Sequence, residues 1–229
     1  MNVRRVFTSI ALAHCLCTPA FAGAPQMLAP GGGSYTVPIT SLKGARFVST
    51  IRQQYDFSCG SAAVATLLTH QYGTKIDEVE VFKHMYERGD QAKIRREGFS
   101  MLDMKLYLDS TGFRAEGVQV NLDQLAAAKV PAIALIRENG YSHFVVIKGV
   151  REGRVVLGDP AMGTRVLARA EFEKHWTNGI LLVVNNRIEL AQFNSDQDWR
   201  VRPKAPLGSA AAAGSGVDLL LLRRGPMDF

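Results

Sequence analysis

The half of the chain that follows Pro131 is made of short runs of β-branched residues separated by turn residues. Asn139-Gly140 and Glu152-Gly153 are tight-turn pairs, and Gly158 and Gly163 punctuate the later runs. Runs of this length with such turns between them predict strands joined by hairpins, and hence an antiparallel sheet. The expected strands cover residues 132–136, 142–150, 154–157, 164–167 and 179–184.

The first half is mainly helical in its pattern. Val64, Leu67 and Leu68 recur at helical spacing, and Ser100 with Asp103 forms a capping box that starts another helix. Helices followed by an antiparallel sheet indicate an α+β fold, with the N-terminal helices packed on the sheet. Helices are expected over 58–72, 77–88, 100–108, 121–130 and 171–176, strands over 35–38, 47–51 and 113–120, and a polar loop over 91–98.

A cysteine stands where a polar loop, residues 52–58, turns into the first long helix. Ser58 is a good N-cap, which puts Cys59 at the helix start. Free backbone N–H groups and the helix dipole favour negative charge there, so we expect a lowered thiol pKa and a nucleophilic Cys59. The alternative is an inert buried thiol that serves as a small hydrophobic residue.

The N-terminus has the pattern of a secretory signal. Arg4 and Arg5 precede a short apolar stretch, and residues 20–22 read Ala-Phe-Ala, so cleavage would leave a mature chain from Gly23. The apolar stretch is too short to span a bilayer, although an uncleaved anchor is the alternative. Cleavage would remove Cys15 and Cys17, and an exported protein with one cysteine left over is a candidate for a reactive thiol.

Charge and composition exclude some function classes. The net charge is +6, or +4 without residues 1–22, and the chain has no dense basic run and no phosphate-loop motif. Nucleic-acid and ATP binding are therefore not expected. Nothing in the sequence calls for a cofactor or a metal, and no transmembrane helix is expected in the mature chain. Residues 191–229 lose periodicity and become low in complexity after Gly208, which predicts a disordered tail.

Three residues could complete a cysteine nucleophile. His143 begins an apolar strand after the Asn139-Gly140 turn, and the next hairpin would bring Asp159 beside it, as a triad requires. Gln53, six residues before Cys59, could join the Cys59 backbone N–H in an oxyanion hole. The alternatives are a half-buried strand histidine, a turn aspartate and a solvated loop glutamine.

Together, Gln53, Cys59-Gly60, His143 in a Ser-His-Phe-Val-Val strand and Asp159-Pro160 resemble peptidase family 39 of the cysteine class. These are papain-like, bacteriocin-processing peptidases, and the resemblance covers residues 45–185. It implies a papain-like domain over 45–190, preceded by a flexible lead and first strand over 23–44. It also implies a nucleophile at Cys59, a base at His143, an orienting residue at Asp159 and an oxyanion donor at Gln53.

Two departures from the family pattern refine this expectation. Ser58 replaces the aspartate that many members carry before the cysteine, and the signal peptide replaces an attached transporter. The chain is similar to stand-alone, exported members found with functional-amyloid or pilus secretion systems. We therefore expect a periplasmic endopeptidase that cleaves a secreted or fibre-forming polypeptide. A non-catalytic, client-binding accessory of a secretion system is the alternative, and a cell-wall amidase is a third hypothesis.

Overall fold

The structure, a computed structural model, describes residues 26–28, 34–36 and 41–200. The predicted signal peptide and the tail beyond residue 200 lie outside these residues. Residues 1–40 and 41–229 form separate units. In the first unit, β1 (Gln26–Leu28) and β2 (Ser34–Thr36) pair as an antiparallel hairpin.

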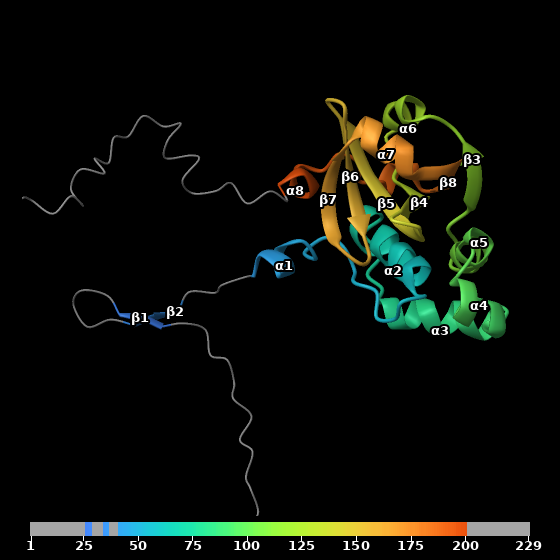
Figure 1. The fold of residues 1–229 in the computed structure, drawn as a ribbon, viewed down its shortest axis with the longest axis horizontal. Coiled ribbons are helices and arrows are strands. Elements are labelled where there is room, and N and C mark those ends of the chain that lie inside the picture. The colour runs from blue at the N-terminus through green and yellow to red at the C-terminus, as the bar shows by residue number, and fades with distance from the viewer. Residues whose placement is uncertain (1–25, 29–33, 37–40, 201–229) are drawn as a thin grey trace, which may run out of the picture. The chain divides into compact units, whose positions relative to one another are not determined.

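A six-stranded antiparallel sheet forms the centre of the second unit, as the turn pattern predicts (Figure 1). The strand order is β3-β8-β4-β5-β6-β7, so the four strands that follow one another from β4 to β7 form a meander. The bounds are β3 Ala115–Gln119, β4 Ala132–Glu138, β5 Tyr141–Arg151, β6 Arg154–Asp159, β7 Gly163–Ala168 and β8 Trp176–Val184.

Two tight turns fix the register of this meander. Asn139 and Gly140 have φ values of 50° and 82°, and Glu152 and Gly153 have 52° and 68°. Two successive positive φ values are the requirement of a type I′ turn, whose twist matches that of the strands it joins. As a result His143, near the start of β5, and Asp159, at the end of β6, come to the same end of the sheet.

Helices cover both faces of the sheet (Figure 1). One buried cluster joins α2, α3 and α5 to residues such as Ile133 and Val146, and a second joins α6 and α7 to residues such as Val145 and Leu157. The helix-then-sheet order predicted from the sequence is confirmed. The helices are α1 Leu42–Ala45, α2 Cys59–Thr66, α3 Glu78–Arg88, α4 Gln91–Glu97, α5 Met101–Ser110, α6 Leu122–Ala128, α7 Arg169–His175 and α8 Asp196–Trp199.

Local differences from the predicted elements have physical causes. Residues 47–51 form bends rather than a strand, because side chains satisfy the backbone there: Ile51 N–H donates to Thr66 Oγ1 at 2.9 Å. Residues 91–97 form α4 rather than a loop, because Asp90 caps the helix and Ile94 is buried. The helix predicted over 58–72 changes at Leu67 into a π-helix, Leu67–Gln71.

Residues 191–200, predicted to belong to the tail, instead pack on the sheet. A short 3₁₀ turn, Ile188–Leu190, and α8 carry the chain across β5. Asp198 of α8 is buried and lies 2.8 Å from the Lys148 ammonium of β5. The sequence conceals this contact because it depends on one acidic residue meeting a lysine 50 positions away.

Candidate active site

Cys59 is the first residue of α2, as predicted, and its side chain is buried with 7% of its surface exposed. The predicted cap is wrong, because the Ser58 hydroxyl bonds the Tyr55 backbone instead of the helix N–H groups. Gly60 allows close packing here: a Cβ at this position would lie 2.9 Å from Phe99 Cβ. The loop and α2 thus hold the thiol in a tightly packed position.

Burial raises the pKa of the Cys59 thiol. Hydrogen bonds from the backbone of Phe144, Gly60 and Cys59 itself lower this pKa but do not outweigh burial, and the nearby Asp159 charge raises it further. The expectation of a lowered thiol pKa from the helix start alone is therefore wrong. The Phe144 contact also places the sulfur beside the first residues of β5. A buried thiol of this kind needs a base to become a thiolate.

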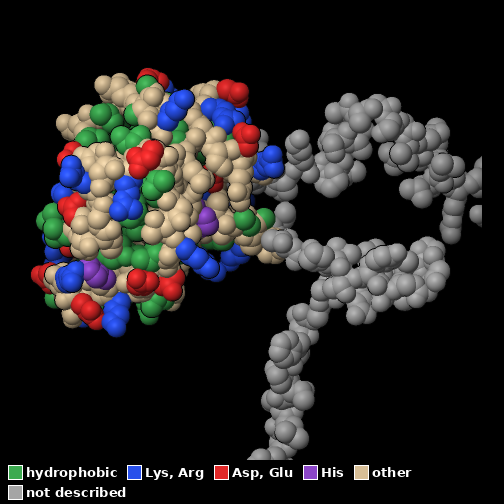
Figure 2. Space-filling model, turned by 180° about the vertical axis from the view of Figure 1, so that it is seen from behind, with side chains coloured by type: hydrophobic (Ala, Val, Ile, Leu, Met, Phe, Trp, Pro, Cys, Tyr) green, Lys and Arg blue, Asp and Glu red, His purple; other side chains and the backbone are tan. Residues whose placement is uncertain are grey.

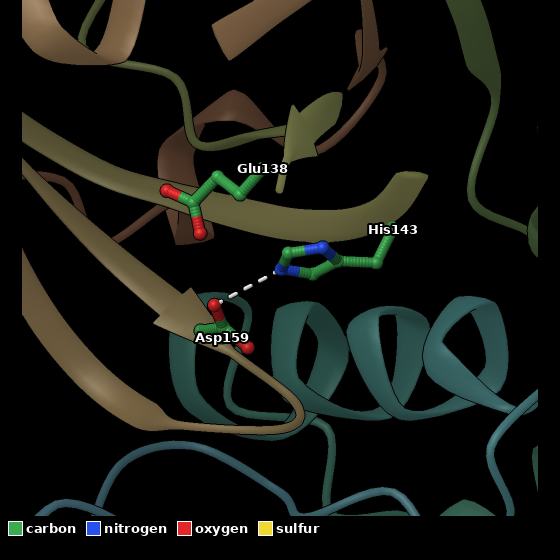
Figure 3. A group of neighbouring side chains, drawn as sticks. All are labelled: Glu138, His143 and Asp159. Carbon is green, nitrogen blue, oxygen red and sulfur yellow. Dashed lines mark hydrogen bonds and ion pairs between the residues drawn. The ribbon is translucent and has the colours of Figure 1, made fainter. Parts of the chain in front are cut away.

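His143 precedes Phe144 in β5, and only one of its two ring nitrogens has a partner among the described residues. Its Nε2 lies 3.1 Å from Asp159 Oδ2, the pair that the two hairpins predict (Figure 3). Its Nδ1 is buried and has no hydrogen-bond partner within the described part of the chain. Buried polar atoms are nearly always paired, so this imidazole nitrogen is left available to a proton donor. Tyr141 stacks on the ring at 5.8 Å.

Asp159 is buried and its carboxylate is held at both oxygens. Oδ1 accepts the backbone N–H groups of Ala161 and Met162 at 2.9 and 3.1 Å, while Oδ2 faces His143 and also Arg165 at 3.0 Å. Burial acts to raise the pKa of this carboxyl, but His143, Arg165 and the Ala161 N–H outweigh it, and the pKa lies below its ordinary value. The residue is therefore an anion that can orient His143.

Gln53 lies next to this group through its backbone, whose N–H donates to Pro160 O at 3.1 Å. Its side-chain Nε2 donates to Tyr55 O at 2.9 Å and reaches Asp56 O only at 3.4 Å, while Oε1 is buried without a partner among the described residues. One N–H of the amide is thus held in the loop, and the other makes only a long contact.

A pocket of about 330 Å³ opens beside Cys59. Phe99, Met101, Leu135 and Phe144 give it an apolar wall, and Lys93 and Glu97 lie at its polar side. Ser142 and Phe144 flank His143 in the sequence, so the pocket reaches both the thiol and the imidazole strand. A cavity with a few polar groups next to reactive side chains is typical of a binding site.

Two further ionisable residues complete the group and were not identified from the sequence. Glu138, His143 and Asp159 have ligand-type atoms within 4.8 Å of one another, a set that could hold a metal ion (Figure 3). Arg165 Nη2 lies 2.8 Å from Glu138 Oε2 and so already bridges the two carboxylates. The available signal was a charged residue within the apolar run 163–168, which suggests a buried ion pair.

The surface of the described residues mixes charges of both signs. Figure 2 shows Lys and Arg side chains interspersed with Asp, Glu and hydrophobic side chains over one face. Among the helices in the described ranges, none is both long and apolar enough to cross a bilayer.

The family model and two curated relatives identify one family. The model of the Peptidase C39 family matches residues 48–188. A "Probable functional amyloid protease FapD" from Pseudomonas aeruginosa is 42% identical over 183 residues, which cover 80% of each chain. Its namesake from Pseudomonas fluorescens is 40% identical over 77% of this chain and 78% of its own. Among solved structures, the peptidase domain of Streptococcus ComA gives a TM-score of 0.49 at 16% identity, covering 60% of this chain and 98% of that domain.

Proposed function

This chain belongs to the Peptidase C39 family and is a papain-like cysteine peptidase, and we propose that it cleaves a secreted or fibre-forming polypeptide through Cys59, His143 and Asp159. One observation carries the proposal. His143 is buried, its Nε2 contacts Asp159, and its Nδ1 has no partner among the described residues. The next residue in β5, Phe144, donates its backbone N–H to the Cys59 sulfur. Cys59 and both sequence neighbours of His143, Ser142 and Phe144, line one pocket.

The proposed reaction uses the free nitrogen of His143 as the base. Nδ1 accepts the proton of Cys59 Sγ, and the thiolate attacks the carbonyl carbon of the scissile bond. The imidazolium then gives this proton to the leaving amine as the C–N bond breaks, which leaves a thioester on Cys59. His143 next takes a proton from water, and the resulting hydroxide displaces the thiolate to give the acid product. The imidazolium then returns its proton to the Cys59 sulfur, which restores the starting enzyme.

Asp159 and Gln53 support these steps. Asp159 accepts the Nε2–H bond, which leaves Nδ1 as the acceptor and stabilises the imidazolium that forms. We assign the Cys59 backbone N–H and Gln53 Nε2 to the oxyanion of the tetrahedral intermediate. The long 3.4 Å contact of Gln53 to Asp56 O leaves that N–H easy to redirect toward a substrate oxygen.

The names of two relatives and the pattern of the N-terminus support a substrate class and a location. Two relatives at 40% and 42% identity carry the name of functional amyloid proteases, which supports an exported fibre-forming subunit, or another secretion component, as the substrate here. The pattern of residues 1–22 supports delivery to the periplasm by a cleavable signal peptide.

The test is cleavage by the chain from Gly23 onward of fibre-forming proteins encoded beside its gene, read by mass spectrometry of the products. We expect one specific cut by the wild type and none by Cys59→Ala or His143→Ala. The half-buried His84, which lies outside this group on α3, offers a matched control, and His84→Ala should cut normally. Cleavage by Cys59→Ala would disprove the mechanism. Binding of the substrate by the wild type without any cut would favour the accessory hypothesis instead.

A further inference from the structure

Four ionisable side chains lie on four adjacent strands at one end of the sheet. Glu138 ends β4, His143 follows the start of β5, Asp159 ends β6, and Arg165 lies near the start of β7. The pairs Ile136–His143, Ile147–Leu157 and Leu157–Arg165 place all four on the same face, because residues two apart in a strand share a face. Only His143 and Asp159 have a role in the proposed reaction.

A single nitrogen of Arg165 connects the two carboxylates. Nη2 lies 2.8 Å from Glu138 Oε2 and 3.0 Å from Asp159 Oδ2, the same oxygen that faces His143. The Arg165 and Glu138 side chains are only 16% and 18% exposed, so water screens these contacts weakly. Arg165 Nε is buried without a partner in the described part of the chain, so the two carboxylates alone hold the guanidinium.

The position of the guanidinium also decides what the acidic group can bind. The ligand atoms of Glu138, His143 and Asp159 lie close enough together for a divalent ion. Because Arg165 Nη2 already bridges the two carboxylates, the positive charge that this cluster requires comes from the chain itself. Glu138 and Arg165 have opposite charges, so the pair adds no net charge to the site. It nevertheless places the positively charged guanidinium of Arg165 in contact with the Asp159 carboxylate.

We propose that Arg165 is a positioning residue that holds Asp159 ionised and fixed on His143, and that Glu138 is the counter-charge that holds Arg165 in place. Arg165 touches no reacting atom and acts only through Asp159. The inference rests on the proposed function in that it takes His143 as the base, but the state of Asp159 can be measured without any substrate.

The test follows the Nε2–H proton of His143 by NMR as the pH is lowered. This proton stays hydrogen-bonded while Asp159 is ionised, and its downfield signal should disappear when Asp159 takes up a proton. An adjacent cation lowers a carboxyl pKa by about one to three units, so Arg165→Met should move the disappearance to higher pH by about that amount. Groups that face Asp159 and must be considered are His143, Arg165, Glu138 and Cys59.

Two companion variants separate charge from folding. Arg165→Lys should restore most of the wild-type profile, because one nitrogen makes both bonds. Glu138→Gln removes the counter-charge that holds Arg165, so it should move the disappearance upward, but by less than Arg165→Met does. An unchanged profile in Arg165→Met or in Glu138→Gln would overturn the proposal. If Arg165→Met fails to fold, the Lys and Gln variants still decide it, since an Arg165→Lys profile shifted above that of the wild type would contradict the single-nitrogen bridge.

The same variants distinguish this inference from the proposed function. If Cys59→Ala still cleaves, the proposed mechanism fails whatever the NMR profile shows. If cleavage needs Cys59 but kcat and the Nε2–H signal are the same in Arg165→Met and the wild type at every pH, only the role of Arg165 fails. We expect Arg165→Met to lower kcat more than it changes KM, because the pocket beside Cys59 does not contain Arg165.

Discussion

Strand β5 carries two buried side chains with ionisable nitrogens, His143 and Lys148, and they differ in how many of their polar atoms have partners. His143 pairs one ring nitrogen with Asp159 and leaves the other without a partner among the described residues. Five residues later, the fully buried Lys148 ammonium has three acceptors for its three protons: Ser49 O, Ser49 Oγ at 2.9 Å and Asp198 Oδ1 at 2.8 Å. We call the His143 group open, because one ring nitrogen has no partner in the described part of the chain, and the Lys148 group closed, because every ammonium proton has an acceptor.

The closed group fastens residues 194–199 to the sheet. Asn194 N–H donates to Lys148 O at 2.9 Å, and Gly149 permits this approach, because a Cβ there would lie 2.2 Å from Asn194 Oδ1. Burial lowers the pKa of Lys148, and Asp198 opposes that shift. The buried Lys148–Asp198 pair, in which every ammonium proton has an acceptor, therefore indicates a structural role. The buried Nδ1 of His143, which has no partner among the described residues, is left available to a proton donor.

Removal of His143 should have the largest effect and tests whether the open group is catalytic. His143→Ala should lower kcat/KM by about 10²- to 10⁴-fold, the usual contribution of a general acid–base group. Its effect on the free energy of unfolding should be small, because Asp159 keeps the N–H groups of Ala161 and Met162 and the Arg165 guanidinium. Urea unfolding beside the cleavage assay checks both halves, and a large loss of stability would show that the group is structural after all.

Removal of Asp198 should produce the opposite pattern. Asp198→Ala leaves the Lys148 ammonium buried without its counter-ion and should cost about 3 to 5 kcal/mol of unfolding free energy, with kcat retained in the folded protein. Asp196 is the matched control: its pair with Arg151 is exposed, so Asp196→Ala should cost less than about 1 kcal/mol.

A double variant shows whether the loss comes from the stranded charge. Lys148→Met combined with Asp198→Leu should be less destabilised than Asp198→Ala, because no buried charge remains unpaired. Equal losses in the two proteins, measured by urea unfolding, would point to packing of α8 rather than to the ion pair.

A smaller loss of kcat is expected when Gln53, the proposed side-chain donor to the oxyanion, is replaced. Gln53→Ala should lower kcat by about 10²- to 10³-fold, the range for loss of one oxyanion donor, with less change in KM. The exposed neighbour Gln54 provides the control, and Gln54→Ala should behave as wild type in the same steady-state assay. Equal activities for the two variants would remove Gln53 from the site and leave it as a loop residue.

The sequence predicts the open group far better than the closed one. Cys59 is placed by a loop-to-helix pattern, and His143 and Asp159 by two hairpin turns, all of which are local signals. Lys148 and Asp198 meet across 50 residues, and nothing local in residues 191–200 shows that they pack. The contact between Glu138 and Arg165 cannot be predicted locally for the same reason, because it depends on the lateral order of strands β4 to β7.

The direction of the Cys59 pKa shift is the property that the local sequence pattern predicts wrongly. The helix start suggests a lowered pKa for Cys59, but the pattern of small and apolar residues around it also produces the burial that raises this pKa. The position of a residue on a helix can be predicted from sequence, whereas its desolvation depends on the packing of β5 and the segment 98–101 around it. The direction of the pKa shift therefore required the structure.

The smallest effect, and the one that links the two groups most directly, is the pH dependence of Cys59 alkylation by iodoacetamide. Only the thiolate reacts, so labelling rises with pH, and a buried thiol alone should react fully only well above the ordinary thiol pKa of about 8.5. If His143 Nδ1 accepts the proton, the wild type should label severalfold faster at pH 7 than His143→Ala.

The control is Asp196→Ala, which removes only the exposed pair with Arg151 and should label at the same rate as the wild type. The chain from Gly23 onward is suitable, because Cys59 is then its only cysteine. Identical profiles for the wild type and His143→Ala would mean that the unpaired nitrogen does not serve the thiol, and the distinction between an open and a closed group on β5 would no longer hold.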